Sequence, residues 1–128
     1  MESEGYKMKD YGKPMKRYVQ TMSLRDNPEL VKLYREAHDE EHSWPEVLAG
    51  IREVGIEEME IYICGTVLVM IVEAPEDFDW QSAMDRLATL PRQAEWENHV
   101  AQFQDCSEGQ RSDEKWHMME RMFHLYDK

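Results

Sequence analysis

The sequence predicts an α+β domain built around a four-stranded antiparallel sheet. Two apolar runs, Glu58–Cys64 and Val67–Glu73, are joined by Gly65-Thr66, and glycine first in a two-residue turn favours a tight hairpin. Two stretches of helical periodicity precede this hairpin and two follow it. Strand-like runs stand near both ends of the chain, so the predicted order is β-α-α-β-β-α-α-β. This is the ferredoxin-like, or split βαβ, plan, with its helices on one face of the sheet.

The first strand is predicted over Lys16–Leu24, and a clear helix start follows it. Asn27-Pro28-Glu29 begins this helix, because asparagine is favoured at the N-cap and proline at the first helical position. The helix should reach about His38. Its inward face, expected to point toward the sheet and away from water, carries Leu30, Tyr34 and His38.

A second helix is predicted from the capping box Ser43-Trp44-Pro45-Glu46 to Val54, with Gly55 as its terminator. The later helices and the last strand are predicted from the same kinds of signal, namely prolines, polar capping residues and apolar faces. These are a helix capped by Asp79 and ending at Leu87, a helix over Gln93–Phe103, a polar loop over Gln104–Lys115 and a strand over Trp116–Tyr126.

Composition narrows the class of protein. Residues 1–15 are polar and aperiodic and are expected to form a flexible lead-in, which leaves a single domain over residues 16–128. The formal net charge of −12 would repel nucleic-acid phosphates and anionic membranes, so neither is an expected partner. Cys64 and Cys106 stand in no metal-binding spacing and are expected to be free thiols in a reducing compartment. With no signal-peptide pattern and no long apolar run, the chain is predicted to be cytoplasmic.

The second strand of the hairpin predicts self-association. Val67–Val72 is apolar at every position, so its side chains are apolar on both faces of the sheet. Helices on one side leave the other face uncovered, and a second copy of the chain is the simplest cover. We therefore expect a homodimer, in which two sheets pack as a dimeric α+β barrel-type assembly.

Tyr34 and His38 are the first candidates for chemistry. A histidine titrates near neutral pH and can carry a proton, and a tyrosine one turn earlier supplies a hydroxyl donor. The alternative is a structural histidine at a helix end, satisfied by a carbonyl or by the acidic residues Asp39, Glu40 and Glu41.

A second pattern overlaps this pair. His38-Asp39-Glu40-Glu41-His42 matches H-x-x-E-H, in which two histidines hold Zn²⁺ and the glutamate is a general base. The motif needs a continuing helix, and Trp44-Pro45 ends the helix almost at once. We therefore predict no metal at this position.

Four tryptophans, Trp44, Trp80, Trp96 and Trp116, form a third group. An indole ring can stack on the C–H face of a sugar, although a tryptophan is also a common core residue. Core packing explains Trp80, which shares a helix face with Met84 and Leu87. Trp96 stands between Glu95 and Glu97 and is the better pocket candidate. Carboxylates that could bind sugar hydroxyls are Glu73, Glu97 and Glu120.

From about Arg17 to Tyr126 the chain resembles the L-rhamnose mutarotase family. The segments that carry the resemblance are Leu33-Tyr34-Arg35-Glu36-Ala37-His38, Trp44-Pro45-Glu46, Glu60-Ile61-Tyr62-Ile63, Gln93-Ala94-Glu95-Trp96 and Met122-Phe123-His124-Leu125. The resemblance implies a dimeric ferredoxin-like fold and interconversion of the α and β anomers of a 6-deoxy sugar without a cofactor. It would make His38 the acid/base and Tyr34 a hydrogen-bond donor to the sugar. Further sugar contacts would be Trp44, Tyr62, Trp96 and Glu97.

The chain departs from the family pattern in three places. The spacing between His38 and Trp44 is longer than in the family, so His42 competes as the acid/base. Met59 stands where rhamnose-specific members carry a second tyrosine, and Glu97 stands where they carry a second tryptophan. These differences leave L-rhamnose and L-fucose both open as the substrate. Two other classes also remain open, namely a monooxygenase-like or haem-handling enzyme on the same dimeric plan and a non-catalytic binding module.

Overall fold

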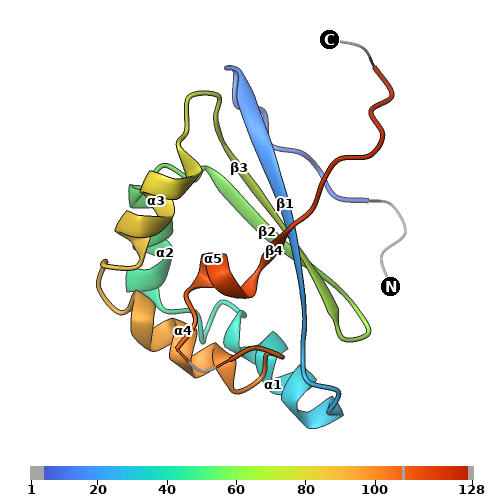
Figure 1. Cartoon of the computed structure of the whole chain (residues 1–128), viewed down its shortest axis with the longest axis vertical. Helices are drawn as coiled ribbons and strands as arrows, with labels where there is room; N and C mark the ends of the chain where they lie inside the picture. The colour runs from blue at the N-terminus through green and yellow to red at the C-terminus, as the bar shows by residue number, and fades with distance from the viewer. Residues whose placement is uncertain (1–4, 108, 127–128) are drawn as a thin grey trace.

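A computed structural model describes residues 5–107 and 109–126 of the chain. One antiparallel sheet has the strand order β2-β3-β1-β4 and comprises β1 (Met15–Ser23), β2 (Glu58–Cys64), β3 (Val67–Pro75) and β4 (His117–Met118). The helices lie on one side of this sheet (Figure 1) and are α1 (Pro28–Ala37), α2 (Pro45–Glu53), α3 (Trp80–Leu87), α4 (Gln93–Ala101) and α5 (Ser112–Lys115). The strand order is that of the ferredoxin-like plan, which confirms the predicted α+β class and its four-stranded antiparallel sheet.

The β2–β3 hairpin has the predicted turn, and β2 has its predicted bounds, whereas β3 continues past the predicted Glu73 to Pro75. Cys64 pairs with Val67, and Gly65 has φ +63°, a conformation that glycine adopts without strain. The inward side chains of β3 are buried beneath the helices, and these are Leu68, Met70, Val72 and Ala74. Its apolar outward side chains remain partly exposed. The sheet therefore has one face in the core and one face toward solvent in the single chain.

Capping differs between the first two helices. As predicted, the Asn27 side chain accepts hydrogen bonds from the backbone of Glu29 and Leu30, at 2.9 and 3.3 Å. The capping box predicted at Ser43 is wrong, because Trp44 is the N-cap of α2 and makes no side-chain cap. The Ser43 hydroxyl turns back instead and donates to the Asp39 carbonyl at 2.7 Å. Ser43 therefore closes the end of α1 and holds Trp44 near it.

Asp79 is the N-cap residue of α3, as predicted, but its carboxylate makes no bond to the helix backbone. It accepts a hydrogen bond from the Ser82 hydroxyl at 2.5 Å instead. The side chains of Met84 and Leu87 on this helix are buried in the core.

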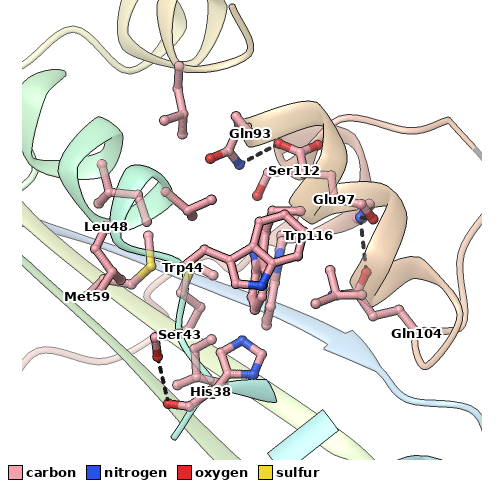
Figure 2. Close-up of a pocket in the computed structure, with 18 of the residues that line it drawn as sticks. His38, Ser43, Trp44, Leu48, Met59, Gln93, Glu97, Gln104, Ser112 and Trp116 are labelled. Atoms are coloured by element: carbon pink, nitrogen blue, oxygen red, sulfur yellow. Dashed lines mark hydrogen bonds between the residues drawn. The ribbon is translucent and has the colours of Figure 1, made fainter. Parts of the chain in front are cut away.

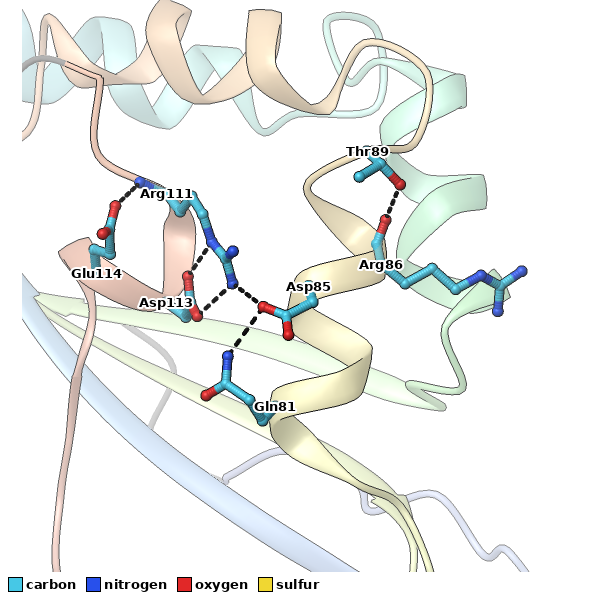
Figure 3. A network of polar contacts seen from close by, with 7 residues as sticks. All are labelled: Gln81, Asp85, Arg86, Thr89, Arg111, Asp113 and Glu114. Atoms are coloured by element: carbon cyan, nitrogen blue, oxygen red, sulfur yellow. Dashed lines mark hydrogen bonds and ion pairs between the residues drawn. The ribbon is translucent and has the colours of Figure 1, made fainter.

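The segment predicted as a polar loop, Gln104–Lys115, is more ordered than its composition suggests. It contains α5, and both Gln104 and Lys115 are buried. The Arg111 guanidinium holds the segment in place by bonding Asp113 at 2.8 Å and Asp85 of α3 at 3.0 Å (Figure 3). Ion pairs thus hold this polar segment against α3, and the pattern of apolar residues in the sequence gives no sign of that contact.

The strand predicted over Trp116–Tyr126 is wrong beyond its first residues. Only His117 and Met118 pair with β1, and the backbone of Met119 adds one bond to the Val19 carbonyl at 2.7 Å. The chain then leaves the sheet (Figure 1). It carries four exposed apolar side chains, Met122, Phe123, Leu125 and Tyr126, of which Met122 is 94% exposed. The alternating pattern is present, but among the described residues only His117 and Met118 of this segment pair with a strand.

Residues 5–14 form no helix or strand and run along the outer face of the sheet. The Tyr11 hydroxyl donates to Glu73 at 2.6 Å, and Arg17 pairs with the same carboxylate at 2.8 Å. Within the part of the chain that the structure describes, no helix is long and apolar enough to cross a membrane.

Candidate active site

A pocket lies between the helices and the inner face of the sheet, and its cavity measures about 110 Å³ (Figure 2). The end of α1 and the turn after it supply Tyr34, His38 and Trp44, while α4 supplies Trp96 and Glu97. Five of the six residues predicted from the sequence to form the site therefore line one pocket. They come together because the turn at residues 39–43 folds back and brings Trp44 against α4.

Aromatic rings form a continuous wall along one side of this pocket. The ring centroids of Tyr34 and His38 are 4.4 Å apart, those of His38 and Trp96 are 5.2 Å apart, and those of Trp44 and Trp96 are 5.3 Å apart. The Arg92 guanidinium covers the Trp44 ring at 4.1 Å, and His99 stacks on the same ring. Such a wall offers the apolar surface on which the C–H face of a sugar can stack.

His38 lies at the rim of the pocket. Sequence periodicity predicted that it faces the sheet, but it is the C-cap of α1 and, as a whole residue, is exposed. Its Nδ1 lies 2.9 Å from the Tyr34 carbonyl oxygen, so Nδ1 carries a proton and the neutral ring keeps a free lone pair on Nε2. Packing against neighbouring rings removes water and lowers the pKa of His38, and the nearby His99 lowers it further. A neutral imidazole with a free Nε2 is a competent base at neutral pH.

Tyr34 lies deeper and is buried. Burial raises its pKa to about 12, while the neighbouring Gln104 side chain acts in the opposite direction. The hydroxyl therefore stays protonated across the physiological range and can donate a hydrogen bond.

A buried polar group forms the opposite wall of the pocket. Gln93 Nε2 donates to the Glu97 carboxylate at 2.7 Å (Figure 2). The Gln93 Oε1 atom is buried and has no hydrogen-bond partner among the residues that the structure describes. Lys115 Nζ donates to the Glu97 carbonyl at 2.7 Å and to Gln104 Oε1 at 3.1 Å. Burial raises the pKa of Glu97 and lowers that of Lys115. This wall gives the pocket hydrogen-bonding groups that face its aromatic side.

Sequence reasoning found only Glu97 in this polar group. Gln93 precedes Glu97 by four residues on one helix, so the spacing could have revealed it. No local signal marks Gln104 or Lys115, because their burial depends on distant parts of the chain: Gln104 forms a β-bridge with Leu24, and Arg111 ties α5 to Asp85.

Tyr62 does not join the pocket. Met59 and Ile61 line the pocket, and the alternation of β2 therefore turns Tyr62 to the outer face. There its hydroxyl donates to Glu60 at 3.0 Å, and its ring lies 5.8 Å from that of Tyr6.

Glu73 and Glu120, the two other carboxylates considered for sugar hydroxyls, also lie outside the pocket. Glu73 pairs with Arg17 on the outer face, and Glu120 is exposed in the segment after β4. Trp80 packs on Tyr18 with ring centroids 4.5 Å apart, in keeping with its predicted core role, whereas Trp116 is buried in the pocket wall.

The two histidines of the H-x-x-E-H motif have separate partners. His42 is exposed, and its Nδ1 lies 2.7 Å from the Asp39 carboxylate, which raises the pKa of His42. Across residues 5–107 and 109–126, no three side chains of His, Cys, Asp or Glu are grouped closely enough to hold a metal ion.

The fold places the chain among α+β proteins that share its architecture. It resembles the crystal structure of an L-rhamnose mutarotase from Formosa agariphila, with a TM-score of 0.64 and 19% identity over 87% of this chain and 99% of that one. It also resembles the tetracenomycin F2 cyclase of Streptomyces glaucescens, a type-II polyketide cyclase, with a TM-score of 0.55 and 15% identity over 88% and 98% of the two chains. At these identities the likeness is one of fold.

The sequence identifies the family. The model of the L-rhamnose mutarotase family matches residues 17–125, and the chain belongs to that family. An L-fucose mutarotase from Xanthomonas campestris pv. campestris is 35% identical over 111 residues, which cover 87% of this chain and 89% of that protein. A UPF0734 protein from Dictyostelium discoideum is 33% identical over 115 residues, or 86% and 90% of the two chains. The predicted family resemblance is thereby confirmed.

Proposed function

We propose that this protein is a mutarotase that interconverts the α and β anomers of a 6-deoxyhexose. The observation that carries the proposal is the pairing of a neutral histidine with a protonated tyrosine in an aromatic-walled pocket. His38 and Tyr34 stand one helical turn apart with ring centroids 4.4 Å apart. Membership of the L-rhamnose mutarotase family supports the same reaction class.

The reaction requires two proton transfers that these residues can perform. Opening a pyranose ring removes the proton of the anomeric hydroxyl and delivers a proton to the ring oxygen, and closing on the other face of the carbonyl reverses both. His38 Nε2 accepts the first proton, because the lowered pKa leaves the ring neutral and Nδ1 is already engaged, and the imidazolium that forms delivers the proton to the ring oxygen bonded to the same anomeric carbon. The Tyr34 hydroxyl donates a hydrogen bond to the sugar. Acid–base help of this kind contributes roughly 10²–10⁴-fold. The ring C–O bond breaks and re-forms with no change of oxidation state, so the proposed reaction uses no cofactor.

We propose that Trp96 is the stacking wall for the sugar, since it touches both His38 and Trp44. Trp44 completes the wall, and Glu97 accepts hydrogen bonds from sugar hydroxyls on the opposite side. The substrate is L-rhamnose or L-fucose. The family is named for the first sugar, and a relative with 35% identity is named for the second.

Anomer exchange measured by saturation-transfer NMR tests the proposal directly. We expect wild-type protein to exchange the anomer signals of L-rhamnose or L-fucose faster than water does. Sugar binding without exchange would mark a non-catalytic binding module, and the absence of both would favour a different enzyme on this fold.

We also propose that two copies associate through the outer face of the sheet. Val67 is 47% exposed on that face, and Phe123 is 70% exposed in the segment after β4. A second copy would cover this face and give the alternating segment that follows Met118 a surface to pack on. Size-exclusion chromatography with light scattering should show a dimer, and Phe123→Asp should weaken it, whereas Glu120→Gln in the same segment should not. A wild-type monomer at micromolar concentration would refute the proposed dimer.

A cytoplasmic location is part of the proposal, and the free thiols of Cys64 and Cys106 support it.

A further inference from the structure

The amide oxygen of Gln93 is an unsatisfied hydrogen-bond acceptor in the wall of the pocket. Gln93 begins α4 and is 4% exposed, so its side chain is shielded from bulk water. Of the buried side-chain nitrogen and oxygen atoms in the residues that the structure describes, Gln93 Oε1 alone has no hydrogen-bond partner. Buried polar atoms are almost always hydrogen-bonded, so an exception in a pocket wall indicates a partner that the chain itself does not supply.

The contact with Glu97 decides which end of the amide is left without a partner. Gln93 Nε2 donates to the Glu97 carboxylate at 2.7 Å, and Glu97 is itself buried. An amide nitrogen donates and an amide oxygen accepts, so turning the group over would place two acceptors against each other. The four-residue spacing keeps both side chains on one face of α4. Gln93 Oε1 is therefore held in position as an acceptor.

The side of the pocket toward which Gln93 Oε1 points is apolar. Figure 2 shows this oxygen turned away from Glu97, toward the side on which α2 carries Leu48. Val47 and Ile51 of the same helix also line the pocket. The side chains of these three α2 residues are hydrocarbon and have no hydrogen bond to donate. The donor for Gln93 Oε1 must then come from whatever fills the cavity.

Gln93 and His38 lie at opposite ends of this pocket. Both residues line the cavity, and the Trp44 ring lies between them in the view of Figure 2. In the proposed function, the anomeric carbon of the sugar, C1, lies at His38. C4 stands across the pyranose ring from C1, so a sugar whose reacting end is at His38 directs its C4 hydroxyl toward the far end of the pocket, where Gln93 lies.

We propose that Gln93 is a specificity-determining residue whose Oε1 accepts a hydrogen bond from the C4 hydroxyl of the sugar. The identity of the ligand as a 6-deoxyhexose rests on the proposed function. L-Rhamnose and L-fucose differ in the orientation of their C2 and C4 hydroxyls, and the C4 hydroxyl is equatorial in L-rhamnose and axial in L-fucose. Because Glu97 holds the Gln93 amide in place, Oε1 fits one of these orientations better than the other. Gln93 thereby contributes to the choice between the two sugars.

Gln93→Met is the variant that removes the acceptor. Methionine has nearly the length of glutamine, but its thioether is only a weak acceptor. Gln81→Met is the matched control. Gln81 also donates to a carboxylate four residues later on a helix, that of Asp85 at 3.0 Å, but it is exposed on α3 and does not line the pocket.

The measurement is binding and anomer exchange of L-rhamnose, L-fucose and the analogue of each that lacks the C4 hydroxyl. We expect Gln93→Met to slow exchange of the sugar that wild type prefers on the order of tenfold, the effect of one hydrogen bond. The same variant should exchange the 4-deoxy analogue of that sugar at the wild-type rate, and Gln81→Met should match wild type with every sugar. Equal losses with the parent sugar and its analogue, or no loss with either, would overturn the proposal.

Wild-type protein supplies a test that does not depend on the folding of a variant. Relative to the rate of each sugar in water, it should exchange the preferred sugar on the order of tenfold faster than the 4-deoxy analogue, and equal rates would overturn the role of Gln93. If wild type binds the sugars and exchanges neither, while Gln93→Met weakens binding of the parent sugar alone, the mutarotase function is wrong and the role of Gln93 stands. If wild type exchanges the sugars and Gln93→Met keeps its rates, the role of Gln93 is wrong and the mutarotase function stands. The absence of both binding and exchange in wild type would overturn both.

Discussion

Replacing His38 with alanine tests the core of the proposed mechanism. The substitution removes the Nε2 that accepts the anomeric proton and leaves Tyr34, Trp44 and Trp96 in place. Catalysed exchange should fall by the whole acid–base contribution, roughly 10²–10⁴-fold, which corresponds to about 3–5 kcal/mol of transition-state stabilisation.

The same substitution should cost little stability. His38 is exposed at the pocket rim and packs on the rings of Tyr34 and Trp96, so the free energy of unfolding should fall by only about 0.5–2 kcal/mol. Its pH dependence has a defined sign. Because the folded-state pKa of His38 lies below its ordinary value of 6.5, the unfolded chain binds the proton more readily as pH falls through 6.5. Wild type therefore loses stability in this window through His38, and His38→Ala should lose less.

The assay is anomer exchange by saturation transfer, with urea unfolding at pH 7 as the control for folding. His42→Ala is the matched variant, since His42 is exposed, four residues away and paired with Asp39 outside the pocket. We expect His42→Ala to interconvert the sugar anomers at the wild-type rate. If His38→Ala keeps the wild-type rate and His42→Ala loses it, the catalytic histidine has been misassigned.

Three further outcomes follow from the structure. Tyr34→Phe should slow exchange less than His38→Ala, because it removes one hydrogen bond worth about 1 kcal/mol and keeps the base, and equal losses in the two variants would contradict these roles. Glu73→Gln should make the free energy of unfolding less sensitive to acid. Tyr11 and Arg17 hold the pKa of Glu73 below its usual 4.5, so wild type loses the stabilisation by these contacts as pH falls below that value. Urea titrations of both proteins at pH 7 and pH 4 would detect the difference. Dialysis against a chelator should leave exchange unchanged, whereas loss of exchange that Zn²⁺ restores would revive the reading of His38 and His42 as metal ligands.

The elements predicted correctly are those with local causes. The Asn27 cap, the Gly65 turn and the β2–β3 register depend on residues within a few positions of one another. Tyr62 shows the limit of the family resemblance. Met59 and Ile61 line the pocket, and the period of two along β2 therefore places Tyr62 on the outer face.

The errors in the second half of the chain have long-range causes. Gln104 and Lys115 look like loop residues, but Gln104 forms a β-bridge with Leu24, and Arg111 ties α5, which carries Lys115, to Asp85. The alternating residues that follow Met118 read as a strand because their pattern matches one. A strand needs a partner edge, and β1 is paired with this segment at only two residues within the single chain.

In the proposed site, the residues for proton transfer are positioned by local structure, whereas the residues for sugar specificity are positioned by long-range contacts. Tyr34 and His38 stand one turn apart at the end of α1, so a protein that keeps this helix and these two residues also keeps their relative positions. The groups facing them, Glu97 and Lys115, come from α4 and α5 and are brought together by tertiary contacts. Under the proposed function, a substitution there should change which hydroxyls the pocket binds without moving the base. A single family can therefore hold members named for L-rhamnose and for L-fucose, and variants of Glu97 should alter the preference between the two sugars more than they alter the dependence of exchange on His38.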